Sequence, residues 1–411
     1  MKTAFCHPVA PFSVDSLLDL ATVNPGAFYL DSSDFSVSNK YSYFSYKPTK
    51  VNISLEHIES HSEYEGAPFW SGGYFGFVSY EGKSQFNYYP IVLVYDLKEK
   101  LFFATSVDND SQAVSEWVKQ LELDIKKLTP QREAASITSE WVRRPDFRSY
   151  EKKVERIKAY LQAGDVYQIN LTEPFRVKTT ASPEQIYKSL RRNNPSPYAA
   201  FINWGDFFIL SASPELFFKQ EGSFIQTKPI KGTRQRIEGQ DEKIKADLVH
   251  SVKDQAELLM ITDLERNDLG RLCQIGSVLV SELCQVETFA TVHHLVATIQ
   301  GRLKELVTIK DIFAALFPGG SVTGAPKIRA MEIIKELEGY QRGIYTGAIG
   351  YIGYGKALFN LPIRTMIYKD GIVDFSTGGG IIIDSTPQEE FEELWWKALG
   401  ALRALGLQRP T

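Results

Sequence analysis

The hydrophobic positions of the first 110 residues fall in short runs, alternating or continuous, that predict β-strands. Runs such as GGYFGFVSY and PIVLVYDL are rich in β-branched and aromatic residues and end at turn-forming residues. Residues 111–128 instead predict a helix. The segment 129–146 is polar and contains Pro130 and Pro145, so it is the best candidate for an internal boundary.

Helical and strand periodicities interleave after this boundary. A helix is expected from near Ser149, with Gly164 as its C-terminal cap, followed by a strand over Val166–Thr172 in which Gln168 and Asn170 share a face. Further helices are expected over 241–262, 309–316, 327–338 and Pro387 to about Leu405. Further strands are expected in FFILSAS, FIQTKPIKG, VLVSELCQVETF, YTGAIGYIG, ALFNLPIRTMIYK and IVDFSTGGGIIID. The order is that of an α+β protein, without regular βαβ alternation.

Composition restricts the class of protein further. The 411 residues are 43% hydrophobic and 12% aromatic, enough for two domains or one large two-layered domain. The net charge of -4 and the absence of a long Lys/Arg run argue against a nucleic-acid surface. No apolar run approaches membrane-spanning length, and the N-terminus is a poor signal peptide. Three cysteines without metal-ligand spacing favour a reducing cytoplasm.

Two expected helices carry carboxylates three residues apart. Asp254 and Glu257 form one pair, and Glu390 and Glu393 form the other, with Lys397 one turn further on. Such oxygen-rich clusters suit Mg²⁺. Solvated helix faces carry the same pattern, although the aromatic residues around the second pair are unusual for a solvated face.

Glycine-rich segments are the second candidate feature. Gly378–Gly380 follow Ser376 and Thr377 at the end of a strand, where backbone N–H groups can approach an anion or the chain can simply turn. The segment FPGGSVTGAPK is not a phosphate-binding P-loop, because Lys327 does not directly follow Gly324.

Four single residues could carry chemistry, and each has an ordinary structural explanation as well. Lys231 in PIKGTRQR is a surface charge or, if it loses its proton, a nucleophile. Glu215 in SASPELFF is either paired or an acid with a raised pKa. His294 is a core histidine or a base. Arg364 interrupts an apolar strand and needs an anion, from the protein or from a ligand.

Taken together, the motifs resemble those of the chorismate-utilising enzymes, which include the large subunits of anthranilate and aminodeoxychorismate synthases and the isochorismate and salicylate synthases. The motifs stand in the family's order over residues 147–400 and are DVYQINLT, SPELF, PIKGTR, KDQAELLMITDLERNDLGR, HHLVATIQG, FPGGSVTGAPKIRAMEII, YTGAIGYIG, IRT and TGGGIIIDSTPQEEFEELWWKA. The first 140 residues match more loosely.

The resemblance implies a fold like that of anthranilate synthase component I. Two large antiparallel β-sheets would pack face to face with helices outside. A β-rich N-terminal region over 1–128 and a chorismate-binding region over 147–400 would build one two-layered unit.

The resemblance also implies roles for individual residues. The implied ligands of Mg²⁺ are Glu257, Glu390 and Glu393, with Asp254 in support. The backbone of Gly378, Gly379 and Gly380 would help the metal to bind the ring carboxylate of chorismate. The other implied substrate-binding residues are Gln168, Gly232, Thr233, Tyr345, Arg364, Thr377 and Lys397. The implied catalytic residues are Lys231 as nucleophile, Glu215 as general acid for the departing 4-hydroxyl, and His294.

Two positions separate the branches of the family. Isochorismate and salicylate synthases use a lysine where this chain has Gln168, and an amide cannot activate water. Anthranilate synthases carry alanine where this chain has Lys231, and lysine there is typical of aminodeoxychorismate synthases. The resemblance therefore implies amination of chorismate to 4-amino-4-deoxychorismate, a step toward 4-aminobenzoate and folate.

The source of ammonia implies a partner. No cysteine lies in a glutaminase-like nucleophile turn, so we expect a separate glutamine amidotransferase subunit in a heterodimer. The chain ends at Thr411, so no fused lyase is expected. The alternatives are an anthranilate synthase component I and, from another class, a non-catalytic subunit that binds chorismate.

Overall fold

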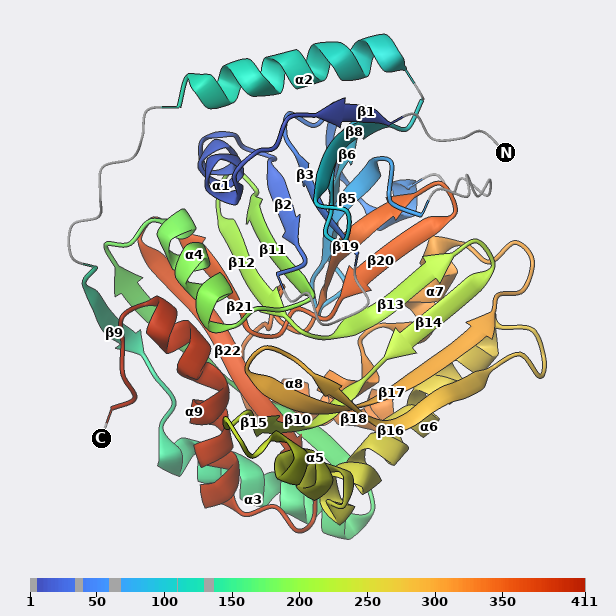
Figure 1. The fold of residues 1–411 in the computed structure, drawn as a ribbon. Helices are drawn as coiled ribbons and strands as arrows, with labels where there is room; N and C mark the ends of the chain where they lie inside the picture. Colours follow the sequence, from blue (N-terminus) through green and yellow to red (C-terminus); the bar gives the residue numbers. More distant parts are fainter. Residues whose placement is uncertain (1–5, 34–39, 59–67, 109, 129–136, 411) are drawn as a thin grey trace.

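Two antiparallel sheets form the centre of the molecule. The computed structural model describes residues 6–33, 40–58, 68–108, 110–128 and 137–410, and within them the strands form a 12-stranded and a 10-stranded sheet (Figure 1). The expected α+β fold with two large antiparallel sheets is confirmed.

The first sheet contains strands from both ends of the sequence. In spatial order its strands are β1 (His7–Val9), β8 (Leu101–Ser106), β7 (Ile91–Asp96), β3 (Tyr41–Ser45), β2 (Phe28–Asp31), β11 (Tyr198–Asn203), β12 (Phe208–Ser213), β21 (Thr365–Lys369), β22 (Ile372–Ile381), β10 (Gln168–Thr179) and β18 (Gly324–Ala325), with β9 (Ser139–Arg143) also paired to β10.

The second sheet also combines strands from early and late parts of the sequence. Its strands in spatial order are β15 (Ile230–Gln235), β17 (Val292–Arg302), β14 (Phe224–Lys228), β13 (Leu216–Glu221), β20 (Lys356–Asn360), β19 (Ala348–Gly353), β5 (Gly73–Val78), β6 (Ser84–Tyr89) and β4 (Lys50–Ile53), with β16 (Leu279–Thr288) also paired to β17.

Helices cover the outer faces of both sheets (Figure 1). Those packed on the first sheet are α1 (Val14–Val23), α3 (Phe147–Ala163), α4 (Pro183–Asn193), α8 (Lys327–Glu338) and α9 (Pro387–Ala404), with α2 (Ser111–Lys126) near its β1 edge. Those packed on the second are α5 (Asp241–Val249), α6 (Val252–Leu272) and α7 (Ile309–Leu316); the short 3₁₀ turns are η1 (Leu55–His57) and η2 (Gly320–Val322). None of the described helices is both long and apolar enough to span a membrane.

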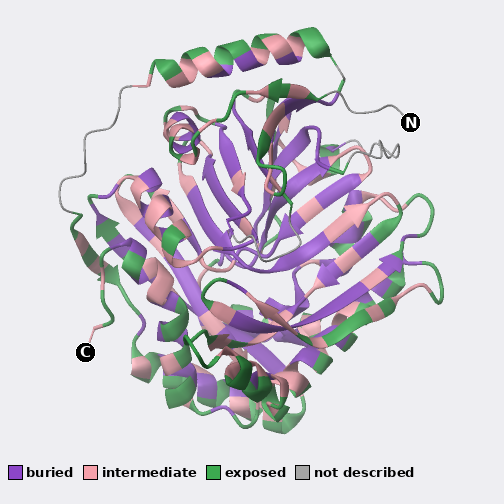
Figure 2. Cartoon of the chain, viewed as in Figure 1, coloured by how far each residue is buried: buried purple, intermediate pink, exposed green. Residues whose placement is uncertain are grey.

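The inner faces of the two sheets meet in an aromatic layer. Phe28 of β2 lies against Phe75 of β5, with ring centroids 4.0 Å apart, and both side chains are fully buried. Trp70 stacks on Tyr351 of β19 with centroids 4.6 Å apart. The strands in this part of the molecule are therefore buried on both faces, as their purple colour in Figure 2 shows. Burial on both faces explains their continuous hydrophobic runs.

The chain crosses from one sheet to the other at two points that matter for the site. The run FFILSASPELFF is β12 in the first sheet and β13 in the second, with Glu215 between them. The expected strand ALFNLPIRTMIYK is wrong as one element: it is β20 in the second sheet and β21 in the first, with Arg364 between them at a φ of 51°.

The helices follow the prediction closely where they have capping residues. The expected helices over 309–316 and 327–338 have these bounds, and Gly164 is the left-handed C-cap of α3. The single helix expected over 241–262 is wrong: the chain breaks after α5, and Ser251 caps α6 by accepting a hydrogen bond from the amide of Asp254. The expected boundary falls partly on residues 129–136, outside the described residues.

Candidate functional site

The two crossings between the sheets are hydrogen-bonded to each other. The amide of Leu361 donates to the carbonyl of Glu215 at 3.0 Å, and the amide of Ala212 donates to the carbonyl of Arg364 at 3.1 Å. These bonds bring Glu215 and Arg364 together although they are far apart in the sequence. Connections between packed sheets are common positions for functional residues, because a rigid scaffold holds them.

Glu215 is buried, and no salt bridge to it occurs among residues 6–33, 40–58, 68–108, 110–128 and 137–410. Its side chain is 5% exposed, and the hydroxyl of Ser321 donates to its Oε1 at 2.7 Å. Burial is the largest effect on this carboxyl and raises its pKa to about 7, while Ser321 and Lys231 act in the opposite direction. A carboxyl that titrates near neutral pH can hold and release a proton under physiological conditions.

Lys231 lies on β15 beside a bulge. The register with β17 shifts between Lys231 and Thr233, and Gly232 takes a φ of 68° there. A Cβ on Gly232 would lie 2.9 Å from the carboxyl carbon of Asp254, so only glycine fits closely against α6. Burial lowers the pKa of the Lys231 amine, which makes the neutral, nucleophilic form more accessible.

Ser321 connects these two groups, and our sequence reasoning missed it. Its hydroxyl binds Glu215, and its backbone carbonyl accepts a hydrogen bond from Nζ of Lys231 at 3.3 Å. Ser321 lies in η2, within the segment FPGGSVTGAPK, which we considered only as a phosphate loop. A hydroxyl next to glycines is too common a sequence signal to single it out.

In the described part of the chain, Arg364 is a partly buried cation without a counterion. Among the described residues its guanidinium makes no hydrogen bond or ion pair, although burial lowers its pKa and Glu215 opposes that effect. Arginine is usually buried only with an anion. The sequence left two sources open for this anion, a protein carboxylate or a ligand. No described carboxylate pairs with Arg364, so the position favours an anionic ligand.

His294 lies opposite Thr233 in the pairing of β15 with β17. Its Nδ1 is 2.8 Å from the hydroxyl of Thr233, and its Nε2 is buried without a partner. Burial, and then the positive charge of Arg364, lower the pKa of His294 to about 3. The imidazole is thus neutral at physiological pH, and its role as a base stays a prediction.

Of the three glycines of β22, Gly379 faces α9, while Gly378 and Gly380 lie against β10. A Cβ on Gly379 would lie 3.2 Å from Oε2 of Glu390 and 3.6 Å from both Oε1 of Glu393 and Nζ of Lys397. Nζ of Lys397 donates to the carbonyl of Gly378 at 2.8 Å and pairs with Glu393 at 2.7 Å. Thr377 fastens the strand to α9 through the carbonyl of Leu394 at 2.9 Å. The glycines therefore leave room for a ligand beside charged side chains.

Gln168 occupies the space beside the third glycine. A Cβ on Gly380 would lie 1.8 Å from Nε2 of Gln168, so a larger residue there would displace the amide. The amide nitrogen lies 3.5 Å from Oε2 of Glu257, and the amide oxygen is buried with no hydrogen-bond partner in the described structure. An unpaired buried oxygen at this position is available to a ligand donor.

The implied magnesium ligands supply suitable atoms. Burial raises the pKa of Glu257 and of Glu390, and the charge of Glu393 adds to both shifts. Lys253 lies 3.8 Å from Glu390, and Asp254 is paired with Arg234 at 2.7 Å. In the described parts of the chain no three acidic, histidine or cysteine side chains converge closely enough to hold a metal. The oxygen donors fit Mg²⁺ chemically, and its binding stays a prediction.

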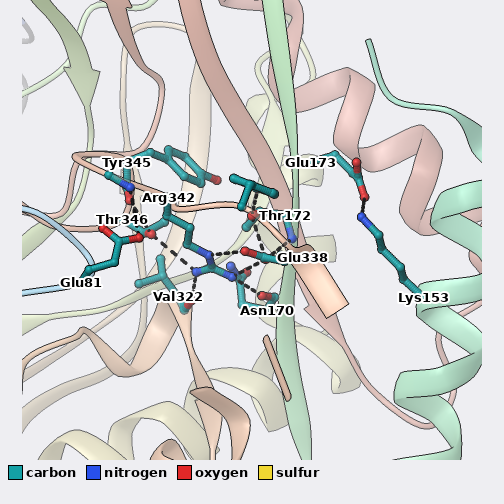
Figure 3. A network of polar contacts seen from close by, with 12 residues as sticks. Glu81, Lys153, Asn170, Thr172, Glu173, Val322, Glu338, Arg342, Tyr345 and Thr346 are labelled. Atoms are coloured by element: carbon teal, nitrogen blue, oxygen red, sulfur yellow. Dashed lines mark hydrogen bonds and ion pairs between the residues drawn. The ribbon is translucent and has the colours of Figure 1, made fainter. Parts of the chain in front are cut away.

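A buried ion pair supports the site from one side (Figure 3). Nη2 of Arg342 lies 2.7 Å from Oε1 of Glu338, and the same guanidinium donates to the carbonyls of Asn170 and Val322 at 2.7 and 2.8 Å. This pair joins β10 to η2. Tyr345 follows it in the sequence and is buried, and burial raises the pKa of its phenol.

Overall, the structure gathers an acid, a lysine, an unpaired arginine, a cradle of glycines and several carboxylates in one part of the molecule. The acid suits proton transfer and the lysine suits nucleophilic attack. The arginine and the glycines suit a ligand with negatively charged groups. Glu215 and Lys231 are connected through Ser321, and none of the other described site residues makes a side-chain hydrogen bond to either of them.

Sequence comparisons identify similar proteins. Residues 34–403 match the model of a family described as chorismate binding enzyme. Aminodeoxychorismate synthase component 1 of Bacillus subtilis is 38% identical over 381 residues, which span 85% of this chain and 80% of the relative. Anthranilate synthase component 1 of Aquifex aeolicus is 39% identical over 273 residues, 64% of this chain and 55% of the relative.

A comparison of structures agrees with these matches. Anthranilate synthase component I from Streptococcus pneumoniae superposes with a TM-score of 0.78 at 28% identity, covering 89% of this chain and 93% of the other. The fold, the family model and the sequence relatives therefore point to one family.

Proposed function

Because the chain belongs to the chorismate binding enzyme family and is an enzyme acting on chorismate, we propose that it aminates chorismate to 4-amino-4-deoxychorismate. The observation that carries the proposal is the arrangement around Ser321. Lys231 and Glu215, a potential nucleophile and a potential acid, bind the same residue. The remaining site residues surround this pair with groups suited to a dianionic substrate.

The proposed reaction has two displacements. The neutral amine of Lys231 forms a bond to C2 of the ring, the two ring double bonds shift, and the C4–O bond breaks. Glu215 gives its proton to the departing 4-hydroxyl, which leaves as water. Ammonia then forms a bond to C4, the double bonds shift back, and the C2–N bond to Lys231 breaks. Covalent catalysis of this kind replaces one difficult step by two easier ones.

The two carboxylates of the substrate would lie beside Arg364 and Lys397. Arg364 has no described counterion and is suited to the side-chain carboxylate. The ring carboxylate fits beside Gly378–Gly380, where Lys397 and backbone amides lie. Mg²⁺ held by Glu257, Glu390 and Glu393 would supply a positive charge to this carboxylate when bound.

Ammonia would come from a glutamine amidotransferase partner. The relatives are named component 1, and the three cysteines of this chain are poor glutaminase nucleophiles, because burial raises the pKa of Cys6, Cys273 and Cys284. A cysteine nucleophile acts as the thiolate, which a raised pKa disfavours.

Anthranilate synthesis is the second candidate, since relatives with that name reach 39–40% identity. Lys231 is the feature that favours amination with retention of the enolpyruvyl group. The two candidates differ in whether pyruvate is released, so product analysis separates them.

The covalent step can be tested on the intact protein. We expect incubation with chorismate and Mg²⁺, without ammonia, to add the mass of chorismate less one water to the wild type and not to Lys231→Ala. Lys228→Ala is the matched control, because Lys228 lies on β14, which pairs with the same strand β17 as β15 does, and its amine pairs with Glu287. An adduct of equal yield in Lys231→Ala would remove Lys231 from this role.

A further inference from the structure

Ser321 is hydrogen-bonded to both proposed reacting groups. It is 8% exposed; its hydroxyl donates to Glu215 Oε1 at 2.7 Å, and its carbonyl accepts from Lys231 Nζ at 3.3 Å. The contacts come from different atoms, so both can exist at once. One residue thereby sets the distance between two side chains that come from separate strands.

The backbone around Ser321 is fixed by buried hydrogen bonds. Arg342 donates to the carbonyl of Val322 at 2.8 Å (Figure 3). The amide of Asn170 donates to the carbonyl of Thr323 at 2.8 Å. The hydroxyl of Thr323 donates to the carbonyl of Gly319 at 3.0 Å. The bonds from Arg342 and Asn170 tie the turn to the Arg342–Glu338 ion pair and to β10, whereas the Thr323 hydroxyl bond lies within the turn. A shift of the Ser321 backbone away from its position would break the first two bonds.

We propose that Ser321 is a positioning residue that holds the acid Glu215 and the amine Lys231 in register for the two displacements. This inference rests on the roles proposed above for those two side chains. Ser321 itself forms no bond to substrate atoms in this account. It acts by orienting the Glu215 carboxyl and by stabilising the ionised form of that carboxyl.

The effect of Ser321 on protonation has a definite sign. A hydroxyl that donates to a carboxylate stabilises the ionised form, so losing it raises the pKa of Glu215 further. The charged groups that face Glu215 are Lys231 on β15, Lys397 on α9, Arg364 in the neighbouring crossing and Glu265 on α6. All four are unchanged in a Ser321 variant, so the difference from wild type isolates the hydroxyl.

Infrared difference spectroscopy can follow the protonated carboxyl band of Glu215 with pH, assigned by its absence in Glu215→Gln. In Ser321→Ala we expect the midpoint to rise by about one pH unit, because a hydrogen bond to a charged group contributes roughly that much. We expect Ser321→Thr to restore the wild-type midpoint. Thr323→Val is the matched control, since it removes a buried hydroxyl from the same turn without touching Glu215.

The spectroscopic result is independent of turnover, so it separates this inference from the proposed function. An unmoved midpoint in Ser321→Ala, or an equal rise in Thr323→Val, would overturn the role of Ser321. If the midpoint rises, the alkaline limb of kcat/KM for the ammonium-dependent reaction should move up by the same amount. A limb that stays in place while the midpoint moves would show that Glu215 is not the acid of that reaction, and would overturn its proposed role.

Discussion

The space between the two sheets differs sharply from one end of the molecule to the other. The aromatic interior, made by Phe28, Trp70, Phe75, Tyr89 and Tyr351, is packed ring against ring. The crossing region, made by Glu215, Lys231, Ser321 and Arg364, instead holds ionisable groups with few partners. The same two-sheet scaffold thus encloses both an apolar core and a charged site.

The difference indicates where the molecule gives up stability for chemistry. Burying aromatic rings stabilises the fold, while burying a charge that lacks a close partner costs free energy. A group kept in such a position therefore suggests a function beyond stability. The comparison can be tested by removing one side chain at a time from each region.

The largest effect on activity should come from Glu215→Gln. The amide cannot donate a proton to the leaving hydroxyl, so we expect kcat/KM to fall roughly 10³-fold, in the range usual for general acids. Steady-state kinetics with chorismate and ammonium measures it. Glu221→Gln, at a partly exposed residue of β13 that pairs with Lys219, is the matched control and should change kcat/KM little. A comparable loss in both variants would contradict the assignment.

The same variant should be more stable than wild type at alkaline pH. Burial raises the pKa of Glu215 from 4.5 to about 7, so its contribution to stability is present below 4.5 and is lost as pH rises through about 7. Glutamine does not titrate and has no such loss. The free energy of unfolding of Glu215→Gln, measured relative to that of wild type, should therefore be higher at pH 8 than at pH 4.5 by up to about 3 kcal/mol. Chemical denaturation at the two pH values checks the sign.

In the aromatic interior, removing a side chain should lower the stability of the fold and leave the activity unchanged. Phe75→Ala should reduce the free energy of unfolding by roughly 3–5 kcal/mol because it leaves a cavity among buried rings. The activity of the molecules that remain folded should be unchanged. Phe224→Ala, at a largely exposed ring, should cost about 0.5 kcal/mol or less. A selective loss of kcat in Phe75→Ala would erase the distinction between the two regions.

Binding of Mg²⁺ should stabilise the fold by the smallest amount, and this effect should depend on the carboxylates of the charged site. At a concentration 100-fold above its Kd the ion should stabilise the fold by about 2.7 kcal/mol, seen as a rise in Tm. The rise should shrink in Glu390→Gln. It should persist in Glu392→Gln, because Glu392 lies on the same helix but pairs with Arg409. An equal rise in both variants would place the ion elsewhere.

Local signals in the sequence predicted the helices well. The bounds of α7 and α8 follow from a capping box at Thr308 and a left-handed Gly339, both readable from the chain. The break between α5 and α6 was missed because Ser251 fits a helix interior as well as a cap. The runs on either side of Arg364 read as one strand because both are buried in different sheets, and hydrophobicity alone does not distinguish sheets.

The residues of the site also fall into two groups, those that the sequence predicted and those that it did not. Lys231, Glu215 and Arg364 came from motifs, because family resemblance marks residues whose chemistry is shared. Ser321 did not, since its bond to Glu215 joins residues 106 positions apart. The hydrogen bonds from Arg342 to the carbonyls of Asn170 and Val322 were missed as well, because β10 and η2 become neighbours of Arg342 only in the fold. Long-range contacts of this kind require the structure.

The most direct test of the central claim is the product formed from chorismate, Mg²⁺ and an ammonium salt, identified by mass spectrometry with a parallel assay for pyruvate. The account predicts an aminated product that retains the enolpyruvyl group, with no pyruvate released. Anthranilate together with an equal amount of pyruvate would contradict it.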